Sequence, residues 1–159
     1  MKTAEEILLE KHINPVSVGP DQTIAAAIDK MNQANIGAIL VEKEGNIIGI
    51  WTERDLLHAV ARPEFQPAAA VMRDHMRTNL RWAEHSTPLM QLEEMFLGLF
   101  IRHILVRREN RFIGLLSIGD VLRSSLLEKD AQLKKLNTVA SWQYYENWGW
   151  DRKKRRQQS

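Results

Sequence analysis

The chain has 159 residues, of which 44% are hydrophobic and 26% are charged, so it can fold around a core of its own. It contains no cysteine, which excludes disulfide bridges, thiolate metal sites and a cysteine nucleophile. No apolar run approaches the roughly 20 residues that cross a bilayer, and the first residues lack the basic-then-apolar order of a signal peptide. We therefore expect a soluble, cytoplasmic protein without a membrane span.

Four elements follow one another in the first half of the chain. Residues 23–34 carry apolar side chains at helical spacing and predict a helix. Two strands are predicted next, over 39–41 and 47–51, with a Glu-Gly-Asn turn between them. The second of these strands is apolar at nearly every position, which indicates cover on both faces. A further helix begins at Thr52 and ends at Pro63. With an initial short strand, the unit reads strand, helix, strand, strand, helix.

The same order of elements recurs in residues 80–127, and individual residues recur with it. The matching positions lie 64 or 65 residues apart: Thr23, Ile28 and Met31 with Thr87, Leu92 and Met95, 39–41 with 104–106, Ile48-Gly49 with Ile113-Gly114, and 55–57 with 120–122. A register kept over four blocks indicates an internal duplication. We predict one repeat over 8–63, a linker over 64–71, a second repeat over 72–127 and a C-terminal extension over 128–159.

Each repeat places a hydroxyl residue three positions before an aspartate at a predicted helix start. Thr52-x-x-Asp55 and Ser117-x-x-Asp120 fit a capping box, which needs no ligand. The same arrangement suits a nucleotide, because a helix N-terminus favours phosphate and an aspartate can accept hydrogen bonds from both hydroxyls of a ribose. Both interpretations can hold at once.

The segments Gly-Ile-Trp-Thr-Glu-Arg-Asp (49–55) and Gly-Leu-Leu-Ser-Ile-Gly-Asp (114–120) resemble the Gly-apolar-apolar-Thr-x-x-Asp signature of CBS (cystathionine β-synthase) domains. Arg-His-Ile-Leu-Val (102–106) resembles the segment before the second strand in many second CBS repeats. The resemblance covers residues 8–127. It implies an α/β fold of two CBS repeats packed as a pseudo-twofold pair, commonly a homodimer. It also implies AMP, ADP, ATP or a related adenosyl compound as regulatory ligand, and no catalytic cofactor.

The resemblance further implies two clefts that each draw on both repeats. One cleft would combine Ser117 and Asp120 with Asn14, Val16, Ile36 and Ala38. The other would combine Thr52, Arg54 and Asp55 with Thr78, Leu80, Ile101 and His103. The apolar members would sandwich adenine, and the arginine would pair with a phosphate oxygen.

The two predicted clefts are not equivalent. Gly119 stands at the position of Arg54, and Arg102-His103 stand at the positions of Gly37-Ala38. The Asp55 cleft is therefore richer in cations, which favours a polyphosphate, and more crowded, which favours closure. Leu40 and Leu105 stand where the family often has proline.

Motifs of the common enzyme classes are absent from the sequence. The five histidines form no His-x-x-x-His pair, and there is no nucleophile elbow, Walker loop or Rossmann loop. We therefore expect a non-catalytic regulatory module without a metal site. Because no effector domain accompanies the repeats, its target should be a separate protein.

The C-terminal extension has its own composition. Residues 128–137 are polar, with leucines at helical spacing, and five aromatic residues follow within 142–150. A basic run over 152–156 accounts for the net charge of +2, so the rest of the chain is mildly acidic. The aromatic residues can cover the body of the protein or dock a partner. The alternative to a nucleotide sensor is thus a structural interaction module, or a weak nucleic-acid binder that uses this terminus. Nucleic acid is the less expected partner, since short basic termini are usually solvated.

Overall fold

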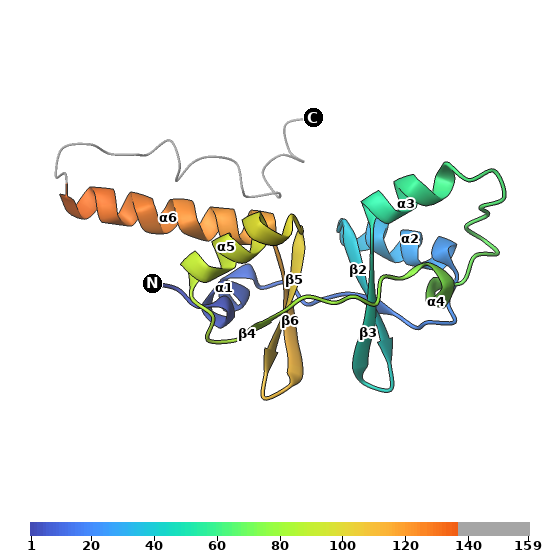
Figure 1. The fold of residues 1–159 in the computed structure, drawn as a ribbon, viewed down its shortest axis with the longest axis horizontal. Helices are drawn as coiled ribbons and strands as arrows, with labels where there is room; N and C mark the ends of the chain where they lie inside the picture. Colours follow the sequence, from blue (N-terminus) through green and yellow to red (C-terminus); the bar gives the residue numbers. More distant parts are fainter. Residues whose placement is uncertain (137–159) are drawn as a thin grey trace.

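We obtained a computed structural model of the chain, which describes residues 1–136. Two halves lie side by side, each with one three-stranded sheet and its helices on the outer side (Figure 1). The first half of the chain forms α1 (Ala4–Lys11), β1 (Ser17–Val18), α2 (Ile24–Ala34), β2 (Ala38–Lys43), β3 (Asn46–Thr52) and α3 (Glu53–Val60). The second forms α4 (Met72–His75), β4 (Trp82–Glu84), α5 (Leu89–Leu99), β5 (His103–Arg108), β6 (Arg111–Ser117) and α6 (Ile118–Leu136).

The two sheets have the same topology. In the first, β1 runs parallel to β2, and β2 pairs antiparallel with β3; the second repeats this with β4, β5 and β6. Even the irregularities recur, because the register shifts between Val41 and Glu42 in one sheet and between Val106 and Arg107 in the other. The duplication predicted from the sequence and the mixed α/β fold are confirmed.

Local sequence explains where the predicted helices begin. The Thr23 hydroxyl accepts a hydrogen bond from the Ala26 amide at 3.1 Å and caps α2. Thr52 and Asp55 form a complete capping box at the start of α3. In β3, Trp51 packs with the helices while Ile50 packs between the sheets, so the end of this strand is covered on both faces as predicted.

The second repeat ends in a longer helix than the first. Residues 128–136, assigned from sequence to a separate extension, continue α6 without a break to a length of 19 residues. The aromatic segment 142–150 and the basic run 152–156 lie outside the described residues. Within residues 1–136, no helix combines the length and apolar character needed to cross a bilayer.

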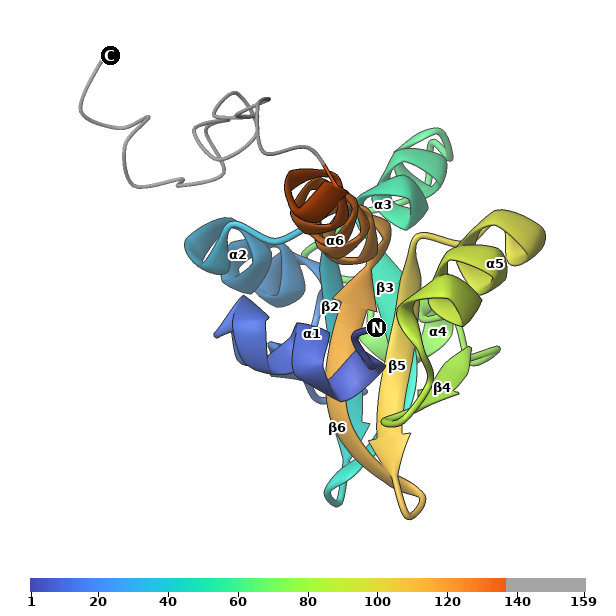
Figure 2. The same ribbon diagram turned by 90° about the vertical axis from the view of Figure 1, so that its left-hand side faces the viewer.

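The first helix of each half of the chain packs on the sheet of the other half. Helix α1 lies on the second sheet, where Ala4 and Ile7 are buried in the core with Leu92 and Leu116 (Figure 2). The amide of Ala4 donates to the Thr87 carbonyl at 2.8 Å and holds the helix there. The core of the second half is therefore completed by a helix of the first half.

Helix α4 makes the reciprocal contact. Met72 is fully buried in the core of the first repeat, together with Trp51. Each of these helices places a side chain against a glycine of the other half. A Cβ at Gly49 would lie 2.5 Å from the sulfur of Met76, the residue that caps α4, and a Cβ at Gly114 would lie 2.7 Å from the Cδ atoms of Leu8 in α1. A side chain at either position would therefore force the Met76 or Leu8 side chain to shift.

A third apolar cluster joins the two sheets. Ala38, Leu40 and Ile50 of the first sheet meet Leu105 of the second, with Leu80 packed against them. The sheets therefore face each other across a dry layer, and the ends of this layer lie next to the starts of α3 and α6. This arrangement places the residues of the candidate site.

Candidate functional site

The two hydroxyl–aspartate motifs adopt the same geometry at the ends of β3 and β6. The Thr52 amide donates to Asp55 Oδ2 at 3.0 Å, and the Asp55 amide donates back to the Thr52 hydroxyl at 3.4 Å. In the second repeat the Ser117 amide donates to Asp120 Oδ2 at 2.7 Å, and the Asp120 amide donates to the Ser117 hydroxyl at 3.2 Å. Both motifs therefore act as helix caps, and this half of the sequence interpretation is confirmed.

Each capping aspartate also holds a cation that the sequence did not assign to it. Arg77 Nε donates to Asp55 Oδ1 at 2.6 Å. Lys11 Nζ donates to Asp120 Oδ2 at 2.7 Å and to the Leu115 carbonyl at 3.1 Å. Both oxygens of Asp55 are thus bonded, so a ribose at this carboxylate has to displace or share Arg77.

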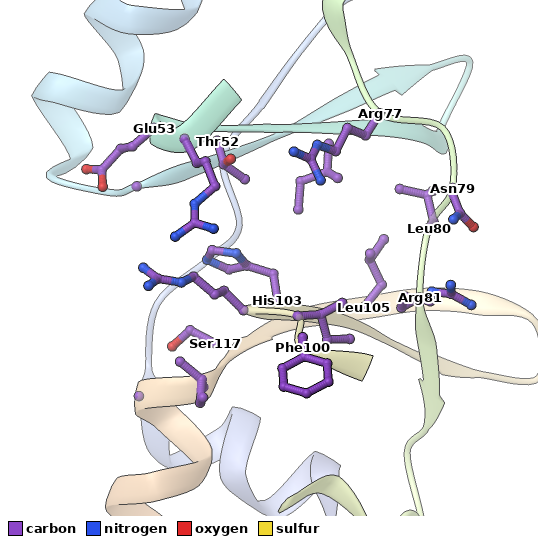
Figure 3. Close-up of a pocket in the computed structure, with 17 residues that line it drawn as sticks. Thr52, Glu53, Arg77, Asn79, Leu80, Arg81, Phe100, His103, Leu105 and Ser117 are labelled. Atoms are coloured by element: carbon purple, nitrogen blue, oxygen red, sulfur yellow. The ribbon is translucent and has the colours of Figure 1, made fainter. Parts of the chain in front are cut away.

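A cavity of about 450 Å³ opens beside these caps, between the two repeats (Figure 3). Six of the residues predicted for the clefts line it: Thr52, Arg54, Leu80, Ile101, His103 and Ser117. Five of them belong to the predicted Asp55 cleft, and Ser117 comes from the other. The structure therefore brings most of the Asp55 cleft together and adds the cap of the second repeat to it.

The remaining predicted site residues do not line this cavity. Asn14 and Thr78 are exposed in the segments that lead into β1 and β4, and Ile36 packs against the first core. Ala38 is buried at the start of β2, and the Val16 carbonyl accepts from the Leu40 amide at 3.0 Å. Asp55 and Asp120 lie behind their caps, in the ion pairs with Arg77 and Lys11.

Several cavity residues were missed from the sequence. Arg77, Arg81, Glu53 and Arg102 line the cavity although none of them was predicted as a site residue. A sequence signal existed for Arg102, because it replaces the glycine found at the same position of the first repeat. Arg77 and Arg81 lie between α4 and β4 of the second repeat, where no motif distinguished them.

His103 is half-buried in the wall of the cavity (Figure 3). Burial lowers the pKa of this imidazole, the Lys11 and Arg102 cations lower it further, and Asp120 opposes them. Since an ordinary histidine pKa is about 6.5, His103 is neutral at pH 7. It contributes hydrogen-bonding atoms to the site rather than charge.

Phe100 lines the cavity in an unusual conformation. It ends α5 with a φ of 51°, and its side chain is 94% exposed. The equivalent residue of the first repeat, Asn35, has a φ of 53°, and asparagine is among the residues that tolerate this left-handed conformation best. The second repeat therefore presents an apolar ring at a position where backbone conformation and solvation both disfavour it.

Metal binding finds no support in the described part of the chain. Within residues 1–136, no group of three or more His, Asp or Glu side chains is placed to hold a metal ion.

Together these features define a class: an α/β module of two repeats whose shared interior forms a charged cavity at two helix N-termini. The family model of the CBS domain matches residues 4–62 and 71–127. The chain belongs to the CBS-domain family, as a tandem pair.

Curated relatives match over the repeats. The mitochondrial CBS domain-containing protein CBSX3 of Arabidopsis thaliana is 31% identical over 129 residues, which are 78% of this chain and 63% of the relative. An inosine-5'-monophosphate dehydrogenase of Aquifex aeolicus is 32% identical over 130 residues, which are 77% of this chain and 26% of the enzyme. The chain thus spans less than two thirds of these relatives, and only about a quarter of the dehydrogenase.

Solved structures share the fold. The CBS-domain containing protein ATU1752 from Agrobacterium tumefaciens is 33% identical with a TM-score of 0.72, covering 78% of this chain and 99% of that one. The CBS domain protein PAE2072 from Pyrobaculum aerophilum, solved in complex with AMP, is 23% identical with a TM-score of 0.69, covering 80% and 97%. The CBS domain pair of MJ0100, in complex with 5'-methylthioadenosine and S-adenosyl-L-methionine, is 19% identical with a TM-score of 0.69, covering 80% and 98%.

Proposed function

We propose that this chain is a non-catalytic regulatory module that binds an adenine nucleotide in the cavity between its repeats. The observation that carries the proposal is the composition of the cavity wall. Thr52 and Ser117, from the caps of both repeats, meet there with apolar Leu80 and Ile101 and with the guanidinium of Arg54. Apolar walls suit a base, hydroxyl groups suit a ribose, and a guanidinium suits phosphate.

Two fold relatives support the choice of ligand class. The Pyrobaculum protein was solved with AMP and the MJ0100 pair with two adenosyl compounds. Both share the arrangement of paired repeats that forms the cavity in this chain. An adenosyl ligand is therefore the first class to test.

Regulation follows from the position of the cavity. Its wall includes residues of the first repeat, of the segment between α4 and β4, and of the α5–β5 and β6–α6 region. A ligand that contacts all three segments stabilises one relative orientation of the repeats, by no more than its difference in affinity for the two orientations. The output is a change in the surface that the paired repeats offer to a separate target protein.

The capping aspartates give the direct test. We expect Asp55→Ala and Asp120→Ala to weaken adenosyl-ligand binding about tenfold, because the two carboxylates accept from the Thr52 and Ser117 hydroxyls and hold these cavity-lining groups in place. Isothermal titration calorimetry with AMP, ADP, ATP and S-adenosylmethionine, and with GMP for comparison, measures the change.

The control variant is Asp29→Ala, which removes an exposed carboxylate from α2. It should leave ligand affinity unchanged. Unfolding midpoints without ligand separate loss of the cap, worth about 1 kcal/mol, from loss of a ligand contact. Wild-type protein that binds no adenosyl compound would contradict the proposed function, and unchanged affinity in both aspartate variants would remove these carboxylates from the site.

The same module is proposed to act as a homodimer through α3 and α6. These helices lie along the same side of the molecule in both views (Figures 1 and 2). Leu57 of α3 is 68% exposed and its counterpart in the duplication, Leu122 of α6, is 54% exposed. Exposed apolar side chains at matching positions of two repeats suit a symmetric contact with a second copy.

An aspartate at either position should break such a contact. We expect Leu57→Asp and Leu122→Asp to convert a dimer to a monomer in light scattering at micromolar concentration, since burying a carboxylate in an apolar interface is strongly unfavourable. The matched control is Leu9→Asp, a similarly exposed leucine on α1. A wild-type monomer, or a dimer that survives both substitutions, would contradict this contact.

A further inference from the structure

The cavity between the repeats carries positive charge that its own residues do not balance. Arg54, Arg81 and Arg102 line it, and none of these guanidinium groups has a hydrogen-bond or ion-pair partner within residues 1–136. Glu53 is the one carboxylate among the lining residues of the described chain. Arg77 is neutralised by Asp55 at 2.6 Å. The excess charge suits an anion with more than one charged group.

Two of the unpaired arginines come from opposite repeats. Arg54 lies in the first turn of α3, and Arg102 immediately precedes β5. At the equivalent positions of the duplication stand Gly119 and Gly37, which also line the cavity. The cations are therefore additions to an otherwise symmetric pair of sites, one from each repeat, and they converge on one cavity.

The surroundings strengthen the attraction for an anion. Helices α3 and α6 both begin at the cavity wall, and their N-terminal ends add positive potential to that of the guanidinium groups. In Figure 3, Arg77 extends toward the interior of the cavity, whereas Arg81 lies on the side away from Thr52 and Ser117 and its guanidinium group is directed away from them. The lining therefore combines cations from both repeats with two helix N-termini, which suits an anion with several charged groups.

We propose that this cavity selects ligands with two or more consecutive phosphates over monophosphates, and that Arg54 and Arg102 bind the outer phosphates. The adenosyl part of the ligand rests on the proposed function; the polyphosphate preference rests on the arginines. A monophosphate can satisfy one guanidinium fork, while a diphosphate or triphosphate offers oxygens to both repeats at once. Arg102 and Arg54 are then the residues that set specificity for phosphate number.

The test measures how ligand affinity depends on the number of phosphates in the ligand and on the number of arginines in the cavity. Wild type, Arg54→Gln, Arg102→Gln and the double variant are titrated with adenosine, AMP, ADP, ATP, GTP and inorganic tripolyphosphate by calorimetry. The control variant is Arg111→Gln, an exposed arginine at the start of β6 away from the cavity. We expect wild type to prefer ATP over AMP at least tenfold, each glutamine to weaken ATP about tenfold, and AMP and adenosine to change far less.

The two proposals fail in different ways. Equal wild-type affinity for AMP and ATP, or an ATP preference that survives in the double variant, overturns the phosphate selection while leaving the adenine site intact. Equal binding of ATP, GTP and tripolyphosphate, all lost in the double variant, supports the phosphate selection and overturns the adenine assignment. If Arg111→Gln lost as much ATP affinity as the Arg54 and Arg102 variants, the loss would come from net charge alone. That result would contradict the assignment of Arg54 and Arg102.

Discussion

Replacing Ile7 with alanine should lower the free energy of unfolding by about 3 kcal/mol, although this residue belongs to the first half of the chain and the core it fills belongs to the second. Ile7 is 3% exposed and packs in the core of the second repeat with Leu92, Phe96 and Leu116. Shortening it leaves a cavity at the junction of α1, α5 and β6, where hydrogen bonds of the Thr87 region to the N-terminus limit collapse. Urea unfolding, monitored by circular dichroism, measures the loss of free energy, provided that its dependence on urea concentration (the m-value) is the same in both proteins.

The control lies two residues away on the same helix. Leu9 is 65% exposed, so Leu9→Ala should change the free energy of unfolding by no more than about 0.5 kcal/mol. Equal effects at the two positions would show that α1 does not pack on the second sheet. The assignment of α1 to the core of the second half would then be wrong.

Replacing Trp51 with alanine should produce the largest loss of stability, about 4 kcal/mol. Trp51 is 1% exposed and is the largest fully buried side chain of the described chain, held between the helices of the first repeat and Met72 of α4. It also immediately precedes Thr52, the cap that lines the cavity. Because the space cannot be refilled without moving this strand end, ligand affinity should fall together with stability.

Trp82→Ala is the matched comparison. Trp82 is half-buried on β4, where its ring meets Phe112 edge-on at 6.3 Å and lies 5.9 Å from the Arg107 guanidinium. Its removal should lower the free energy of unfolding by no more than about 2 kcal/mol and leave ligand affinity nearly unchanged. Differential scanning calorimetry of both variants, with and without ATP, gives the two quantities. A larger loss for Trp82→Ala would contradict the assignment of the main core to the helix side of the first sheet.

The sequence was sufficient for everything that repeats along the chain. Apolar spacing predicted α2, β2, β3 and α3, and the 65-residue recurrence extended these elements to the second half. The hydroxyl–aspartate spacing predicted both helix caps, because a capping box forms within four consecutive residues and depends on no distant partner. Five residues predicted for the Asp55 cleft from the resemblance to CBS domains line the cavity, and their part in ligand binding stays a prediction.

The partners of the capping aspartates were not predictable in the same way. Arg77 lies 22 residues from Asp55, and Lys11 lies 109 residues from Asp120. Neither pair follows a periodicity, because Lys11 at the end of α1 and Arg77 after α4 each reach a helix start across the fold. The lack of an ion-pair partner for Arg54 and Arg102 within residues 1–136 likewise depends on the tertiary structure, which brings no carboxylate within pairing distance of them.

By itself, the amino-acid sequence determined the helices and strands that recur in both repeats, the duplication and the chemistry of the two caps, because these depend on local spacing and on a pattern that occurs twice; helix α1 was not among the predicted elements. Only the tertiary structure decided that α1 completes the second core and α4 the first, that the capping aspartates are already paired with Lys11 and Arg77, and that unpaired arginines from both repeats meet in one cavity. These contacts join residues far apart in the chain, and their free energies depend on how two sheets face each other, which no local pattern encodes.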